Sequence, residues 1–123
     1  MARIRITAGS VSVEADLAES PTAEKLLAAL PITGSGNRWG DEIYFSIPVE
    51  ADQEADARAE MGVGEIAYWP PGSAFCIFWG PTPASSGSEP RAASPVNVLG
   101  QIDGDATAFG AVSSGTKVVI EAV

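Results

Sequence analysis

Short runs in which apolar and polar residues alternate are the feature that most limits how this chain can fold. Residues 3–7 read RIRIT and residues 10–16 read SVSVEAD. Because successive side chains of a strand point to opposite faces, each run predicts a strand with one apolar face. We expect a hairpin with Ala8 and Gly9 as its loop, because this register makes both faces chemically consistent. The expected inward pairs are Ile6 with Val11 and Ile4 with Val13, and the expected outward pairs are Arg5 with Ser12 and Arg3 with Glu14.

Two segments carry helical signals instead. Residues 20–31, SPTAEKLLAALP, offer Ser20 as the N-cap and Pro21 at the first helical position. Pro31 is expected to end this helix. A second, short helix is predicted around Phe109.

One later run is apolar on both faces. In residues 73–80, SAFCIFWG, alternate positions are Phe75, Ile77 and Trp79 on one side, with Cys76 and Phe78 on the other. A strand of this kind is expected to be covered on both sides, here by the core and by a helix. Short strands with two helices, in the order β-β-α-β-β-β-β-α-β, predict an all-β, closed antiparallel barrel. The other predicted strands are residues 42–49, 65–69, 96–102 and 116–123.

Composition limits the partners of this chain. Its 123 residues predict a single domain, residues 1–123. A net charge of −9 repels phosphate backbones, so no nucleic-acid partner is expected. No apolar run approaches the ~20 residues that span a bilayer, so no membrane partner is expected either. The alternating start lacks the apolar centre of a signal peptide, and we therefore predict a cytoplasmic protein.

Missing residue types exclude several chemistries. The chain has no histidine and one cysteine, Cys76. These counts rule out intramolecular disulfides, zinc sites built from Cys and His, and Ser-His or Cys-His nucleophile pairs. Asp103 and Asp105 are expected to form a turn and cap the second helix. We predict neither a metal site nor a cofactor.

Several segments resemble cyclophilins. Residues 20–30 look like the first cyclophilin helix, residues 72–83 like the GSQFFI strand and its exit, and residues 96–112 like the stretch that leads into the last helix. Residues 39–49, 68–72 and 94–102 are similar to signature stretches of a small prokaryotic cyclophilin-like family of unknown function. Together these segments reach nearly the whole chain. The resemblance implies a closed eight-stranded antiparallel barrel whose ends are capped by two helices.

Cyclophilins are peptidyl-prolyl isomerases, and their active strand carries Phe-His-Arg, whose arginine polarises the prolyl nitrogen. The corresponding strand here reads EIYFSIP, residues 42–48, and has neither His nor Arg. The cyclophilin Gln falls on Ala74, and a pocket Phe falls near Cys76. The resemblance therefore favours the barrel and argues against the classical isomerase chemistry.

A binding protein for a peptide or small molecule is the function that these residues favour. Tryptophan and tyrosine combine apolar area with a polar group, which suits ligand contact. The alternative is that these aromatic side chains only cover the ends of the barrel and that residues 38–42 form ordinary surface ion pairs. The predicted ligand-binding residues are Trp39, Tyr44, Trp69 and Phe78 for apolar contact, with Arg38 and Glu42 for polarity.

Two other functions stay open. One is a divergent prolyl isomerase, for which Arg38 is a weak catalytic candidate and Arg91 is a second source of a cation. The other is a structural or interaction module, in which exposed aromatic side chains pair two copies into a homodimer.

Overall fold

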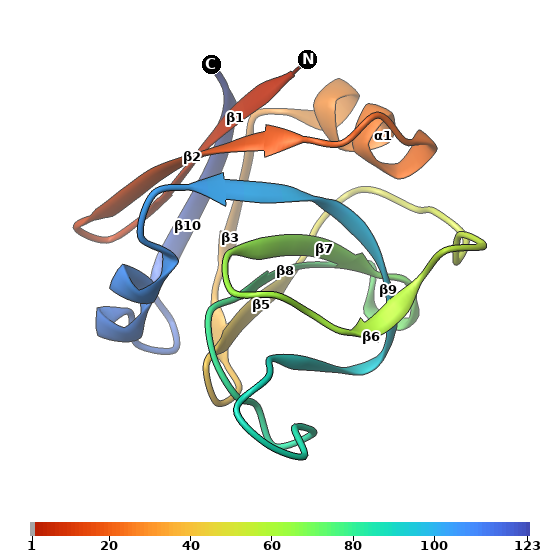
Figure 1. Ribbon diagram of the computed structural model, residues 1–123. Coiled ribbons are helices and arrows are strands. Elements are labelled where there is room, and N and C mark those ends of the chain that lie inside the picture. The colour runs from red at the N-terminus through yellow and green to blue at the C-terminus, as the bar shows by residue number, and fades with distance from the viewer. Residues whose placement is uncertain (1) are drawn as a thin grey trace.

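The computed structural model describes residues 2–123 and is built almost entirely of β-strands (Figure 1). Helices fall at the two predicted places, and one further helical turn joins two strands. The elements are β1 (Arg3–Ala8), β2 (Val11–Leu17), α1 (Pro21–Ala29), β3 (Ile32–Ser35), β4 (Asn37–Arg38), β5 (Glu42–Ser46), β6 (Arg58–Glu60), β7 (Glu65–Trp69), η1 (Pro70–Gly72), β8 (Ala74–Phe78), β9 (Arg91–Asp103), η2 (Ala106–Ala111) and β10 (Lys117–Ala122).

The strands form one open antiparallel sheet, so the predicted closed eight-stranded barrel is wrong. The order of paired strands is β3-β10-β1-β2-β9-β7-β8-β5-β4, with β6 paired to β9 outside this path. Across residues 2–123 no pairing joins the two ends of the path. The mainly β class and the two helices are confirmed.

The sheet stays open where the chain passes from β3 to β4. A Cβ atom on Gly34 would lie 2.5 Å from the Phe45 ring, so this ring packs directly on the β3 backbone. Gly36 then ends β3, and its amide donates to the carbonyl of Thr116, 2.9 Å away. The chain changes partner here, from β10 to β5. The Phe45 ring therefore covers the core face of β3, and within residues 2–123 no backbone pairing joins β3 to β5.

The first hairpin forms, but its predicted register is wrong by two residues. The loop is Gly9–Ser10, and Ala8 pairs with Val11 instead of lying in the loop. The first loop position has φ +61°, which Gly9 adopts without the steric cost that Ala8 would carry at that position. A shift of two residues keeps every side chain on its predicted face, because strands have a period of two. The observed pairs are Ile6 with Val13, Ile4 with Ala15, Arg5 with Glu14 and Arg3 with Asp16.

Helix α1 begins as predicted. The hydroxyl of Ser20 accepts a hydrogen bond from the amide of Ala23 at 3.1 Å, and Pro21 occupies the first turn. Asp105 caps η2 in the same way, accepting from the Thr107 amide at 3.0 Å. No helix between residues 2 and 123 is both long and apolar enough to cross a membrane. The cytoplasmic location stays a prediction.

Strand β8 is covered on both sides, as predicted, but the cover on its outer side is not a helix. Phe75 and Ile77 point into the main core, whereas Cys76 and Phe78 belong to a second apolar cluster. This outer cluster, as we call it, contains Met61, Ala67, Ala74, Cys76, Phe78, Ala92 and Val96. The first half of β9 supplies Ala92 and Val96, so a strand replaces the expected helix.

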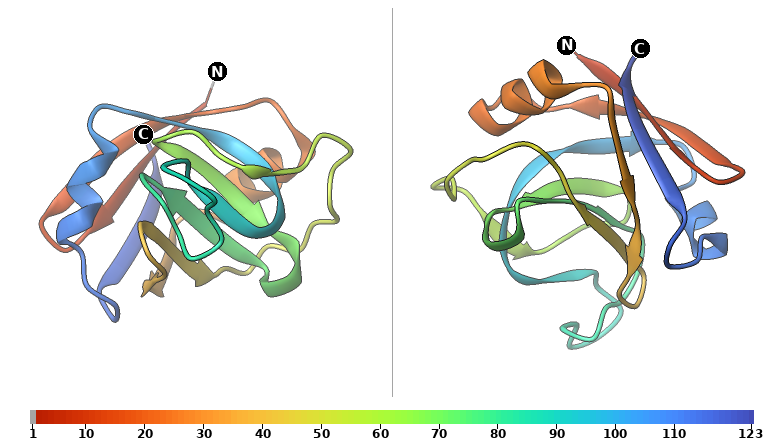
Figure 2. Two further views of the ribbon diagram at one scale, coloured as in Figure 1. Left: turned by 60° about the horizontal axis from the view of Figure 1, so that its bottom comes forward. Right: turned by 180° about the vertical axis from the view of Figure 1, so that it is seen from behind.

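Strand β9 can serve as this cover because it bends strongly (Figures 1 and 2). Its last residues pair with β2, its middle with β7 and its first residues with β6. The pairing with β7 is irregular between Ile66 and Ala67, and such a bulge bends a strand. At Gly100 the backbone of β9 approaches the Asp16 carbonyl of β2 so closely that a Cβ atom would collide with it.

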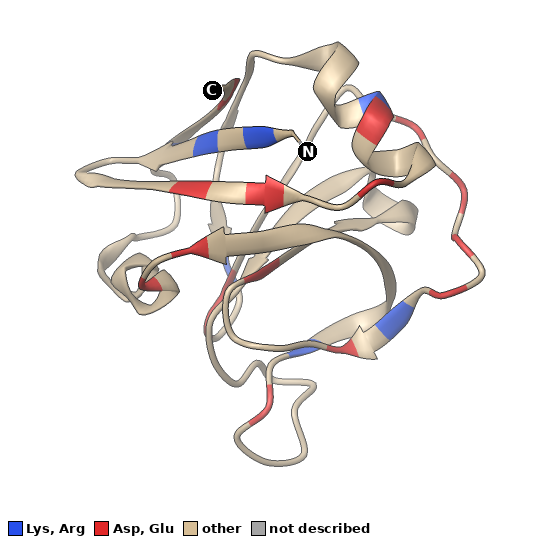
Figure 3. Cartoon of the chain, turned by 45° about the horizontal axis from the view of Figure 1, so that its top comes forward, with Lys and Arg blue, Asp and Glu red and all other residues tan. Residues whose placement is uncertain are grey.

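A buried asparagine holds the acidic connection between β5 and β6. Asn97 of β9 is fully buried; its Oδ1 accepts from the Glu54 amide at 2.8 Å, and its Nδ2 donates to the Asp52 carbonyl at 2.9 Å. The Nδ2 group also donates to the Thr22 hydroxyl at 3.1 Å, and that hydroxyl donates to the Glu54 carboxylate. Arg58, four positions after Glu54, forms its ion pair with Glu65. Figure 3 shows the acidic residues along this connection.

Candidate functional site

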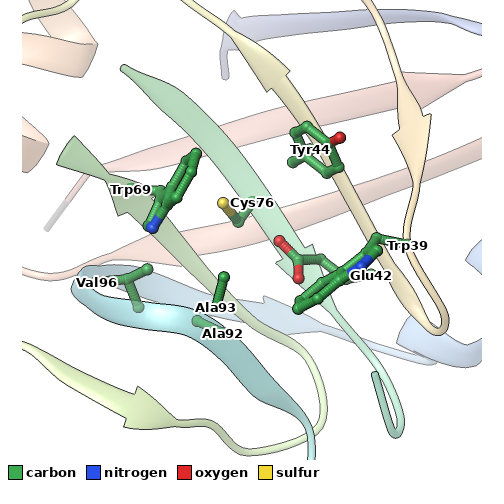
Figure 4. Close-up of a pocket in the computed structure, with 8 residues that line it drawn as sticks. All are labelled: Trp39, Glu42, Tyr44, Trp69, Cys76, Ala92, Ala93 and Val96. Carbon is green, nitrogen blue, oxygen red and sulfur yellow. The ribbon is translucent and has the colours of Figure 1, made fainter. Parts of the chain in front are cut away.

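A concave pocket lies between β5, β7, β8 and the first half of β9 (Figure 4). Its volume is about 140 Å³. An apolar cavity of about 150 Å³ is large enough to hold benzene, so this pocket suits one ring or one side chain. The residues that line it are Trp39, Glu42, Tyr44, Trp69, Cys76, Ala92, Ala93 and Val96.

Strand alternation places the floor of the pocket. Ile43 and Phe45 of β5 point into the main core, so Glu42 and Tyr44 point to the opposite face. Tyr44 pairs with Cys76 of the neighbouring strand, which brings the thiol onto the same face. The floor is thus a direct result of the two-residue period of β5 and β8.

A tight turn brings Trp39 over this floor. The turn joins β4 to β5, and the Trp39 amide donates to the Glu42 carbonyl at 2.9 Å. Gly40 has φ +62°, and a Cβ atom there would lie 2.8 Å from the Thr82 Cα atom. Only glycine therefore fits this position without moving the segment that begins at Pro81.

Replacing Gly40 by alanine is expected to destabilise the protein and to displace Trp39. Gly9→Ala is the matched control, because Gly9 has φ +61° but its nearest heavy atom would lie 3.5 Å from an added Cβ. Both variants place an alanine at a positive φ angle, which costs free energy, but only Gly40→Ala also creates a steric clash. The free energy of unfolding should therefore fall by about 1 kcal/mol more for Gly40→Ala than for Gly9→Ala. Urea unfolding measures the difference, and equal losses would show that the turn relaxes freely.

Trp69 forms the opposite wall. Its indole Nε1 donates to the hydroxyl of Ser94 at 2.7 Å, which ties the ring to β9. Figure 4 shows Trp69 and Trp39 on opposite sides of Cys76 and the Glu42 carboxyl group. The two indoles therefore offer apolar surfaces across a narrow space.

Glu42 is the unusual member of the site. The residue is 4% exposed, and its Oε1 atom has no hydrogen-bond partner in the described part of the chain. Burial raises the pKa of Glu42 from 4.5 to about 7, and the neighbouring Cys76 thiol opposes this rise. A buried polar atom without a partner is costly and uncommon in folded proteins. The carboxyl group is therefore a natural anchor for a ligand that can donate a hydrogen bond.

The profile of the cyclophilin-like family matches residues 2–121. The chain belongs to the cyclophilin-like family. This confirms the prediction made from the signature segments.

Two solved structures resemble this cyclophilin-like chain. The solution structure of a hypothetical protein from Archaeoglobus fulgidus shares 39% sequence identity over 99% of this chain and 95% of that one, with a TM-score of 0.84. The structure of McbB in complex with tryptophan is 18% identical and has a TM-score of 0.65. The match covers 96% of this chain but 44% of McbB, and it shows the fold alone. No curated protein matches the chain.

Four of the six predicted site residues of this cyclophilin-like chain meet in one pocket: Trp39, Glu42, Tyr44 and Trp69. Phe78 is fully buried in the outer cluster and does not line the pocket. Ligand binding by the four pocket residues stays a prediction.

Arg38 faces away from the pocket, although it precedes Trp39. Its guanidinium donates to the carbonyls of Gly110 and Val112 at 3.0 and 3.1 Å, and to the Asp41 carboxylate at 3.1 Å. It also lies 4.9 Å from the centre of the Trp79 ring, within the range of cation–π contacts. Arg38 thus ties the turn at Gly40 to the end of η2.

Arg91, the other proposed cation, is also engaged. It forms ion pairs with Glu60 and Glu89, both at 3.1 Å. Neither Arg38 nor Arg91 is among the residues that line the pocket. Neither cation is therefore placed to polarise a prolyl nitrogen in this pocket.

Sequence reasoning missed part of the pocket. The predicted ligand-binding residues do not include Cys76, and no strand is predicted over residues 81–95. The strand actually starts at Arg91, and Ala92 and Ala93 form one wall. The sequence did contain one signal for this wall: Ala92 and Ala93 are small and lie just before the predicted strand at residues 96–102. From residue 2 to residue 123, no group of three or more His, Cys, Asp or Glu side chains could hold a metal ion.

Proposed function

We propose that this cyclophilin-like chain is a binding protein for a small organic molecule, or for one side chain of a peptide, and that the pocket between Trp39 and Trp69 holds this ligand. The observation that carries the proposal is the unpaired Oε1 atom of Glu42 in a pocket with aromatic walls. Ligand pockets typically combine apolar walls with a few polar groups that fix the orientation of the ligand.

The walls and the floor support a ligand of limited size. Trp39, Tyr44 and Trp69 supply flat apolar surface, and the alanines of β9 leave room between them. The volume of about 140 Å³ is below the ~300 Å³ of typical drug-sized sites. A compact molecule or a single side chain therefore fits better than an extended peptide.

Amide chemical-shift mapping by NMR tests this proposal. Pools of small metabolites and short peptides are added to the labelled full chain. A ligand should shift amides of residues 39–44, 68–76 and 92–96 together. Trp39→Ala should weaken binding by about 10-fold, the effect of losing one aromatic contact of 1–2 kcal/mol.

Val63→Ala is the control, because Val63 is 54% exposed and does not line the pocket. This variant should bind like the parent protein. Shifts scattered over the surface, or none from any pool, would refute the proposal. If the same amides shift with protein concentration alone, the pocket receives a second copy of the chain, and sedimentation at several concentrations would show the dimer.

A further inference from the structure

We infer that the ligand is a compact organic cation, an ammonium group on a body about the size of one ring, and that its N–H groups donate to the Glu42 carboxylate between the two indoles. This inference rests on the proposed function and names the chemical class of its ligand. Three features of the pocket lead to it.

The first feature is the orientation of Glu42. Its carboxyl group is more than nine-tenths buried, and Figure 4 shows it pointing into the space between Trp39 and Trp69. The Oε1 atom accepts no hydrogen bond from residues 2–123. A ligand that brings its own donor would satisfy this atom, and a charged donor would form the stronger, charge-assisted bond.

The second feature is the aromatic wall. The negative faces of indole and phenol rings attract cations, and tryptophan does so most strongly. Trp39 and Trp69 flank the carboxyl group, and Tyr44 lies beside it on β5. A cation held by Glu42 would therefore meet an aromatic side chain on either side.

The third feature is that no lysine or arginine among residues 2–123 lines the pocket. All five arginines form ion pairs with carboxylates outside the pocket: Arg3, Arg5, Arg38, Arg58 and Arg91. Lys25 donates to the Glu50 carbonyl at 3.0 Å.

The pocket is lined by the acidic residue Glu42 and by Tyr44 and Cys76, and none of its lining side chains is cationic. A net charge of −9 also favours cations around the whole molecule.

Other ligand classes fit less well. An anion would meet the Glu42 carboxylate at close range, and like charges repel in a partly buried site. A metal ion needs several ligands, and within the described residues no group of three or more His, Cys, Asp or Glu side chains is available. A neutral apolar molecule would leave the Oε1 atom without a donor.

The test uses three probes of similar size and different charge: benzylamine, benzyl alcohol and benzoate. Binding to the full chain is measured at pH 8 by calorimetry, and the site is located by amide shifts. Benzylamine should bind at least about 10-fold more tightly than benzyl alcohol, the effect of one hydrogen bond to a charged group. Benzoate should bind more weakly than either.

Glu42→Gln should remove the preference for the amine by lowering its affinity at least about 10-fold, while benzyl alcohol changes little. Glu65→Gln is the matched control, since it removes the same charge from a residue that pairs with Arg58 outside the pocket. This control variant should keep the preference for benzylamine. An amide spectrum of each variant confirms that it is folded.

The outcomes separate this inference from the proposed function. If benzyl alcohol or benzoate binds in the pocket as tightly as benzylamine, the cationic ligand class is wrong and the binding function stands. An amine preference that survives in Glu42→Gln also refutes the role of this carboxylate. If no probe shifts the pocket amides, this inference is wrong, and the metabolite and peptide pools then decide the binding function separately.

Discussion

Replacing Asn97 by alanine should lower the free energy of unfolding by about 3 kcal/mol, because several hydrogen bonds are lost together and their partners stay buried. The Asn97 side chain bonds to the Glu54 amide, the Asp52 carbonyl and the Thr22 hydroxyl. It thereby joins β9 to the start of α1 and to the acidic connection. Without it, the backbone groups of residues 52 and 54 lose their partner, and this connection should open to solvent.

Urea unfolding and amide hydrogen exchange measure both effects. Exchange should accelerate at Glu54, whose amide donates to Asn97, before the sheet itself opens. Asn37→Ala is the matched control, since Asn37 is exposed and its amide group makes one side-chain hydrogen bond, to the Tyr44 carbonyl at 3.2 Å. The control should stay within about 0.5 kcal/mol of the parent protein. An equally small loss for Asn97→Ala would mean that water replaces the lost bonds.

The stability of the protein should fall between pH 5 and pH 8 because of Glu42. Burial raises the pKa of this carboxyl group in the folded protein to about 7, while the unfolded chain keeps a value near 4.5. Between these values the folded state holds a proton that the unfolded state has released, so rising pH favours unfolding. The expected loss from pH 5 to pH 8 is about 2.5 kcal/mol, and the curve should flatten above pH 7.

Glu42→Gln should remove this slope and leave the variant more stable than the parent protein at pH 8. Other groups with shifted pKa values affect stability outside the range from pH 5 to pH 8. The pKa values of Glu89 and Asp105 are lowered, so their stability effects appear as pH falls below about 5. Burial raises the pKa of the Cys76 thiol well above its usual value, so its effect appears at higher pH. Urea unfolding followed by tryptophan fluorescence gives the two curves, and parallel curves would show that Glu42 ionises freely in the folded state.

These two variants also test separate parts of the molecule. Asn97 lies in the middle of β9 and holds the acidic connection, whereas Glu42 lies on the floor of the pocket. A Glu42→Gln protein that is stable at pH 8 is also the form required for the ligand measurements. Stability and binding can therefore be followed in the same sample.

Local pattern accounts for the pocket residues that could be predicted. Alternation in β5 puts Glu42 and Tyr44 on one face, and the turn at Gly40 keeps Trp39 close to them along the chain. Trp69 could be placed because it ends the strand next to the turn at Pro70. Each of these inferences depends on residues only a few positions apart.

Contacts between distant segments account for the errors. Residues 81–95 look like a loop by composition, but a strand starts at Arg91 because this residue pairs with Glu60 of β6. Arg38 looked available for a ligand, and its true partners at the end of η2 are more than 70 positions away. No local sequence pattern predicts the pairing of β6 with β9 or the hydrogen bonds of Arg38.

The sequence by itself determined which side chains share a face of a strand, because side chains alternate with a period of two. The two-residue shift of the first hairpin leaves these faces unchanged. The sequence also identified the helix caps and the cyclophilin-like family. Whether the sheet closes was decided only in three dimensions, because strand pairing depends on which distant segments meet: the chain changes partner at Gly36, from β10 to β5, and within residues 2–123 no pairing joins β3 to β4. The bend of β9 likewise created the pocket, because a wall built from distant strands depends on how the whole sheet curves.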